Sequence, residues 1–217
     1  MAILLPSILT KDPDEILEKL KFLEAIPGLT HAQIDFADGK FVANTLAQPK
    51  DIGQLSSRLV IEAHLMVMEP QKYYHDLQML GVNLVFIHFE SFKKNEDVLT
   101  AIRNAKTLGL RCGLAVNPNT PINVFDSFIN DLDESLIMGV NPGLQGQKFI
   151  AATTERISTL RDRHNDVIIE VDGGVKLDNF ESIVSYGVNK INVGSGIWQT
   201  PDAKQTIYDF LSKLKNS

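Results

Sequence analysis

The sequence predicts one (β/α)8 barrel, a TIM barrel, spanning residues 1–217 as a single domain. Short apolar runs rich in β-branched residues alternate with longer stretches whose apolar residues have helical spacing. Eight such pairs fit into 217 residues, a length that a single α/β barrel can occupy. An open, doubly wound sheet is the alternative, but no G-x-G-x-x-G motif follows the first strand, and eight repeats favour closure.

The expected strands are the short apolar runs. The opening MAILLPSIL lacks the basic start and the cleavage site of a signal peptide, so it is interpreted as the first buried strand. Buried parallel strands are nearly continuous apolar runs of this kind. The strands are expected at 2–9, 31–36, 61–67, 84–89, 111–116, 135–140, 168–172 and 190–194.

The segments between the strands are expected to be helices. Several begin with Asp, Asn, Thr or Pro, as in KDPDE, NEDV, NTPI and TPDA, which suits the first turn of a helix. The helices are expected at 12–26, 50–57, 71–80, 95–108, 121–132, 148–164, 178–186 and 201–215.

Composition limits the classes of partner. A net charge of −6, with both signs spread along the chain, argues against nucleic acid or an anionic membrane. Cys112 is the single cysteine, so we expect no internal disulfide and a buried, inert thiol. No apolar run approaches eighteen residues, so we expect no membrane partner and a cytoplasmic location. We also expect a homo-oligomer.

The C-terminal ends of the strands carry the candidate functional residues, because the active site of such a barrel lies there. Gln33 and Asp35 are two residues apart on one strand and face the same side. Asp35, His64 and Asp172 come from three strands and together suit a divalent transition metal. The two carboxylates could instead act as acid and base on opposite faces of a substrate carbon. The alternative is structural: the Asp residues cap loops, and His64 is a satisfied core histidine.

Glycines follow the last strands, where barrel enzymes frequently bind phosphate. Backbone N–H groups of Gly173–Gly174 and of Gly194–Ser195 can converge on a dianion. A single pair of this kind is also typical of a tight turn, but two pairs at these strand ends favour a phosphate site. His88 could line the mouth of the barrel and is assigned a structural role.

Six segments resemble, in order and spacing, the signatures of the ribulose-phosphate 3-epimerase family. The match runs from Leu5 to about Trp198, and the segments read LLPSIL, IDFADGKFVAN, AHLMV, VNPGLQGQKF, EVDGGV and VGSGIW. The resemblance implies the same barrel and an isomerase that inverts C3 of a phosphorylated ketose. The substrate it implies is D-ribulose 5-phosphate, converted to D-xylulose 5-phosphate.

The resemblance also implies roles for individual residues. Asp35 and Asp172 would be the catalytic acid and base, and with His64 they would bind a divalent cation (Zn, Fe, Mn or Co). The sugar and its phosphate would be held by Ser7, His64, Met66, Met138, Gly143, Leu144, Gln145, Gly146, Asp172, Gly173, Gly174, Gly194 and Ser195.

Several positions depart from the family pattern. Gln33 stands where members usually carry a histidine ligand, so it would be a weak fourth ligand through its amide oxygen, or a hydrogen-bond donor. Ala37 replaces a methionine, Ala43 a proline, and Leu144-Gln145 a Phe-Gly pair. These changes leave open a ketohexose 6-phosphate as substrate. A paralogue that binds sugar phosphate without turnover is the other alternative, although binding alone needs no opposed pair of carboxylates.

Overall fold

The computed structural model describes residues 2–216, and these residues form a closed barrel of eight parallel strands. The strands follow one another around the barrel in chain order, and β8 pairs with β1 to close it. Closure confirms the predicted barrel and excludes the open sheet. The strands are Ile3–Ile8 (β1), His31–Ala37 (β2), Val60–Met66 (β3), Leu84–His88 (β4), Arg111–Val116 (β5), Glu134–Met138 (β6), Ile169–Asp172 (β7) and Lys190–Val193 (β8).

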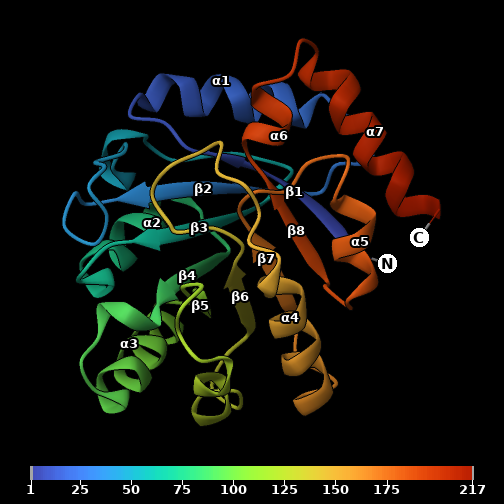
Figure 1. Cartoon of the computed structure of the whole chain (residues 1–217). Coiled ribbons are helices and arrows are strands. Elements are labelled where there is room, and N and C mark those ends of the chain that lie inside the picture. The colour runs from blue at the N-terminus through green and yellow to red at the C-terminus, as the bar shows by residue number, and fades with distance from the viewer. Residues whose placement is uncertain (1, 217) are drawn as a thin grey trace.

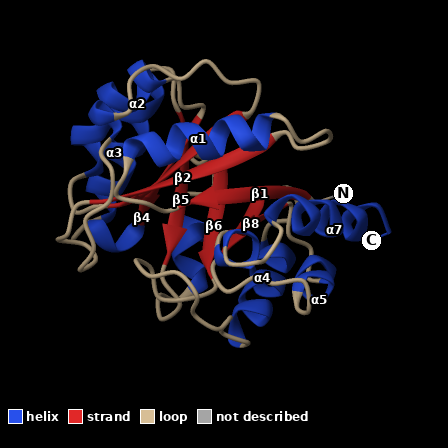
Figure 2. Cartoon of the chain, turned by 90° about the horizontal axis from the view of Figure 1, so that it is seen from above, coloured by secondary structure: helices blue, strands red, loops and turns tan. Residues whose placement is uncertain are grey.

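Helices surround the strands, as Figures 1 and 2 show. The first of them begins as its sequence predicts, because the Asp12 side chain accepts a hydrogen bond from the Asp14 N–H and Pro13 opens the helix. The helices are Pro13–Glu24 (α1), Tyr74–Leu80 (α2), Asn95–Thr107 (α3), Ala152–Arg163 (α4), Phe180–Ser185 (α5), Ser195–Trp198 (α6) and Ala203–Asn216 (α7).

Two of the expected helices are wrong. Only a 3₁₀ turn, Pro49–Asp51, forms within the segment expected as a helix at 50–57, and Gly53 then takes a left-handed conformation with φ of 77°. The segment expected at 121–132 contains a 3₁₀ helix, Ile122–Ser127, in place of an α-helix. Its Asn, Asp, Ser and β-branched residues are weak helix formers. Helical spacing of apolar residues therefore does not distinguish a tight turn from a full helix.

A polar layer fills the lower part of the barrel interior. Lys190 begins β8, and its Nζ lies 2.5 Å from Glu62 Oε1 and 2.6 Å from Glu134 Oε2. Glu170 Oε2 lies 4.0 Å from the same ammonium. All three carboxylates are buried, and burial raises the pKa of Glu62 and of Glu170. Glu134 is also paired with Arg111, at 2.8 Å, whereas the ammonium of Lys190 supplies the positive charge beside Glu62 and Glu170.

Replacing Lys190 with methionine should lower the free energy of unfolding by about 3–5 kcal/mol, because it leaves buried carboxylates without their cation. The unpaired acids would then fold in their protonated form, and the folded state would bind more protons than the unfolded state. The loss should therefore be larger at alkaline than at acidic pH. Urea unfolding at two pH values measures it, and Lys204→Met on exposed α7 is the matched control. An equal loss at both pH values would contradict this account.

A membrane span needs a long apolar helix, and none of the helices within residues 2–216 meets that requirement.

Candidate active site

A cavity opens at the C-terminal ends of the strands, with about 490 Å³ of free space when the open solvent at its mouth is included. The long loop between β6 and α4, yellow in Figure 1, passes over the strands and contributes one wall. All the residues that the resemblance marks for substrate binding line this cavity, together with Asp35. The further lining residues lie within the segments that carry the family resemblance but were assigned no role from the sequence: Leu9, Val140, Pro142, Gln147 and Val175.

The floor of the cavity holds two carboxylates and an imidazole. Asp35 lies near the end of β2 beside His64 of β3, and Asp172 ends β7. His64 Nδ1 lies 3.0 Å from Asp35 Oδ1 and 3.4 Å from Asp172 Oδ2. Met66 and Met138, each 2% exposed, pack at the cavity wall. The structure therefore brings together the three polar residues that the sequence placed on separate strands.

The charges at the floor shift the ionisation of its members. Burial raises the pKa of Asp35 from 3.8 to about 6, although hydrogen bonds from His64 and Gln33 oppose the rise. Burial acts to lower the pKa of His64, but hydrogen bonds to Asp172 and Asp35 outweigh it and raise that pKa to about 9. Asp35 is thus ionised and His64 protonated near neutral pH, when no metal is bound.

The pH dependence of turnover should show the raised pKa of Asp35. If this carboxylate acts as a base in protein freed of metal, kcat/KM should fall as the pH drops below about 6, and not below 3.8. Initial rates at low substrate concentration, measured across the acid range, give this part of the pH profile of kcat/KM. Gln33→Leu removes a hydrogen bond that favours the ionised carboxylate, so it should shift the fall in kcat/KM to higher pH. A fall in kcat/KM only near the ordinary pKa of an aspartate would contradict the assignment of Asp35 as that base.

Gln33 lies just below the floor and is fully buried. Its Nε2 donates to Asp35 Oδ1 and to Asp172 Oδ2, each at 2.9 Å. Its Oε1 accepts a hydrogen bond from Asn192 Nδ2 at 3.0 Å and so faces away from the carboxylates. The sequence suggested a weak ligand through the amide oxygen or a hydrogen-bond donor, and in this structure the donor nitrogen faces the acids.

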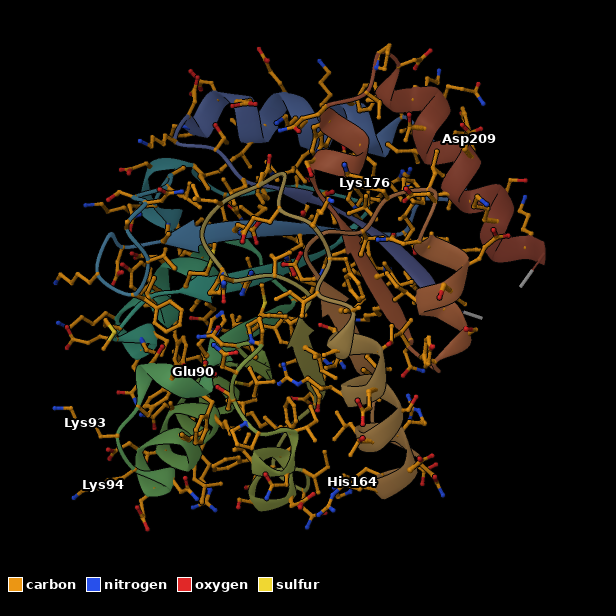
Figure 3. The ribbon with its side chains drawn as sticks, viewed as in Figure 1. Glu90, Lys93, Lys94, His164, Lys176 and Asp209 are labelled. Carbon is orange, nitrogen blue, oxygen red and sulfur yellow. The ribbon has the colours of Figure 1, made fainter. Side chains whose placement is uncertain are left out.

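His88 continues the polar group on the other side of His64. The two Nε2 atoms lie 2.8 Å apart, and His88 Nδ1 lies 3.3 Å from Glu90 Oε2. Burial lowers the pKa of His88 to about 4, so a neutral His88 accepts at Nε2 from protonated His64 and donates at Nδ1 to Glu90. Figure 3 labels Glu90 on the segment after β4, while Lys93 and Lys94 extend outward. The sequence assigned His88 a structural role, and in this structure His88 lies where its Nε2 can hold the ring of His64.

Glycines shape the opposite side of the cavity. Gly174 has φ of +73°, and a Cβ there would lie 2.5 Å from the backbone nitrogen of Phe149. A Cβ on Gly194 would lie 2.9 Å from Ser7 Oγ and 3.2 Å from Gln145 Nε2. The chain therefore approaches itself closely along this wall, and backbone groups are exposed to a ligand in the cavity. Leu144, 64% exposed, stands at the rim.

The donor set at the floor fits a divalent transition metal. One ligand atom from each of Asp35, His64 and Asp172 lies within 4.8 Å of the other two. Two carboxylate oxygens and an imidazole nitrogen are ligands that Zn, Fe, Mn and Co accept. These three residues would hold the ion.

Fold and site together define a (β/α)8 barrel with two buried carboxylates and an imidazole at the floor of its cavity. The model of the Ribulose-phosphate 3 epimerase family matches residues 3–198, and the chain belongs to this family. "Ribulose-phosphate 3-epimerase" of Aquifex aeolicus is 36% identical over 208 residues, covering 93% of this chain and 92% of the relative. The protein of the same name from Escherichia coli K12 is 33% identical over 217 residues, covering 96% and 94%. The chain is therefore an isomerase-class enzyme, a sugar-phosphate epimerase.

More distant solved structures share the fold. A tryptophan synthase α-subunit from Pyrococcus furiosus has a TM-score of 0.72 at 15% identity, covering 97% of this chain and 98% of its own. The 3-hexulose-6-phosphate synthase from Salmonella typhimurium has a TM-score of 0.70 at 14% identity, covering 100% and 99%. At such identities these likenesses show the barrel architecture alone.

Proposed function

We propose that the chain interconverts D-ribulose 5-phosphate and D-xylulose 5-phosphate by inverting C3. The observation that carries the proposal is the pair of buried carboxylates, Asp35 and Asp172, at the floor of a glycine-walled cavity. A cavity of this shape can take a sugar at the acids and its phosphate at the glycines. The names of the family and of its relatives support the same substrate.

The mechanism is proton transfer by two bases. One carboxylate removes the C3 proton, which is acidic because it lies α to the ketone, and leaves an enediolate. The other carboxylate, which starts protonated, delivers its proton to the opposite face and so inverts the centre. The raised pKa of Asp35 suits a group that both takes and gives a proton near neutral pH. Met66 and Met138 keep water from the reacting carbon. A divalent cation bound by Asp35, His64 and Asp172 would supply Lewis acidity.

A coupled assay of the purified protein against pentulose and hexulose phosphates, with and without chelator, tests the substrate. We expect the highest kcat/KM with ribulose 5-phosphate. A higher value with a ketohexose 6-phosphate would replace the proposed substrate, and the Leu144-Gln145 pair at the cavity rim would then be the first residues to exchange. Absence of turnover on every ketose phosphate would refute the proposal.

Inorganic phosphate should inhibit competitively, because it would occupy the glycine wall in place of the substrate phosphate. Gly174→Ala should weaken this inhibition about tenfold or more, since the new methyl group collides with the Phe149 backbone and strains a left-handed residue. Inhibition constants for the two proteins measure the effect. Gly53→Ala, also at a positive φ but with no atom within 4 Å of the new methyl group, is the control. Noncompetitive inhibition, or equal constants, would place the phosphate elsewhere.

A further inference from the structure

The Gln33 amide bridges the two carboxylates at the floor of the site. Its nitrogen donates one hydrogen bond to Asp35 and one to Asp172, both at 2.9 Å. A primary amide nitrogen carries two hydrogens, so both are used. The bridge holds the two acids at a fixed separation without any contribution from a substrate, since Gln33 lies beneath the cavity lining.

The orientation of this amide is set from both ends. The nitrogen is the amide end that faces Asp35 and Asp172, and it donates one hydrogen to a carboxylate oxygen of each. At the other end Asn192 donates from Nδ2 to Gln33 Oε1 at 3.0 Å. Turning the amide over would place its oxygen against two acids and its nitrogen against another N–H donor. Asn192 therefore opposes the reversed orientation.

Asn192 is itself held from below. It lies on β8, is 1% exposed, and its Nδ2 also donates to Glu170 Oε1. Glu170 belongs to the polar layer that contains Lys190. A column of hydrogen bonds thus rises from the lower barrel through Glu170, Asn192 and Gln33 to the candidate acid–base pair. Asn192 is not among the residues that line the cavity.

This column bears directly on metal binding. Each amide hydrogen takes up one lone pair, of Asp35 Oδ1 and of Asp172 Oδ2, and the amide nitrogen has no lone pair of its own to offer a cation. The two hydrogens also carry partial positive charge, so they weaken the attraction of the carboxylates for a cation placed between them. The amide can leave by turning over, and that turn breaks its hydrogen bond with Asn192.

We propose that Asn192 is a positioning residue that locks the Gln33 amide against the two carboxylates and thereby sets how tightly the site binds a divalent cation. In the locked state hydrogen bonds hold the two acids together, and a cation binds more tightly once the amide has turned. The inference goes beyond the proposed substrate and mechanism, and rests on them only in taking the bridged carboxylates as the acid–base pair.

Asn192→Asp tests the lock, because it keeps the shape of the side chain and reverses its hydrogen bonding. The new carboxylate needs a donor, so it should draw the Gln33 nitrogen downward and turn the amide oxygen toward Asp35 and Asp172. Three oxygens and the His64 nitrogen would then face one point, which favours a cation. Asn192→Leu is the second variant, since it removes the lock without reversing it.

The measurement is the affinity of chelator-stripped protein for Mn²⁺ and Zn²⁺, by calorimetry, with melting temperature as the check on folding. Substituting a residue that hydrogen-bonds to a metal ligand typically changes metal affinity about 10–100-fold. We therefore expect Asn192→Asp to bind the cation at least about tenfold more tightly than wild type, and Asn192→Leu to have an affinity between the two. Damage to the fold would weaken cation binding, so an increase in affinity cannot result from a structural defect.

Wild-type affinity in both variants would overturn the proposal, and so would weaker binding in folded protein. Cation affinity is measured without substrate, so a protein inactive on ribulose 5-phosphate would still show the shift. Failure of the proposed function and failure of this inference are therefore separate results. In the active protein, the lock also predicts that Asn192→Leu lowers kcat more than it changes KM, because Asn192 holds the acids through Gln33 and does not line the cavity.

Discussion

Replacing Asp172 or Asp35 with asparagine should lower kcat for C3 inversion by about 10²–10⁴-fold, the usual contribution of a general acid or base. Asparagine has the size of aspartate and keeps one acceptor oxygen for the Gln33 amide, so the fold should survive. Each variant retains one proton carrier of the two that inversion requires. The melting temperature and the far-UV circular dichroism spectrum check that the loss is chemical.

Hydrogen exchange separates the roles of the two acids. In deuterated water, the remaining carboxylate of each variant can still remove and return a proton on its own face of the substrate. Asp35→Asn should therefore exchange the C3 hydrogen of one epimer without inversion, and Asp172→Asn that of the other, as proton NMR would show. The double variant should exchange neither epimer. Near-wild-type inversion in a single variant, or exchange of the same epimer by both, would refute the two-base assignment.

The barrel was predictable because its signal is local. Buried parallel strands are apolar along their whole length, and each of the eight appears within two residues of its expected ends. The connections were less predictable. The segment after β2 has helical spacing but forms only a 3₁₀ turn ending near Gly53, because packing against the barrel and a left-handed glycine outweigh the pattern.

The candidate site was predictable where its members lie at strand ends. Asp35, His64 and Asp172 were found because a barrel gathers such ends at one rim. Asn192 was missed because its proposed role depends on contact with Gln33, 159 residues away in the chain. The only signal in the sequence was a polar residue two positions before Gly194, on the same face of β8 as Lys190. His88 was noticed, but its contact with His64 could not be predicted without knowing how β3 and β4 are staggered relative to each other.

Replacing Gln33 with histidine should raise the affinity for Zn²⁺ or Mn²⁺ at least about tenfold. Position 33 faces the two carboxylates from below, and the wild-type amide presents hydrogens to them, not a lone pair. An unprotonated imidazole nitrogen is a good donor to these metals and would complete a set with Asp35, His64 and Asp172. Metal content after side-by-side dialysis, by elemental analysis, measures the change.

The residues around position 33 can accommodate a metal-bound histidine there. A metal-bound histidine usually donates its other N–H to an oxygen acceptor, which fixes the ring. Among the described residues, Asn192 Oδ1 is buried and has no hydrogen-bond partner. A turn of the Asn192 amide would bring this oxygen toward the new ring. Adding Asn192→Leu to Gln33→His should therefore remove part of the gain, whereas the same Leu substitution in wild type should increase affinity.

Gln33→Leu separates the two effects of the substitution. Leucine removes the amide hydrogens that compete for the carboxylates but adds no ligand, so its affinity should lie between those of wild type and Gln33→His. The step from wild type to Leu measures competition by the amide, and the step from Leu to His measures the added ligand. Equal, stoichiometric metal in wild type and Gln33→His would show that Gln33 costs the site no affinity. Affinity in Gln33→Leu equal to that in Gln33→His would mean that the amide hydrogens alone keep the metal out, because an empty position would then serve as well as a ligand.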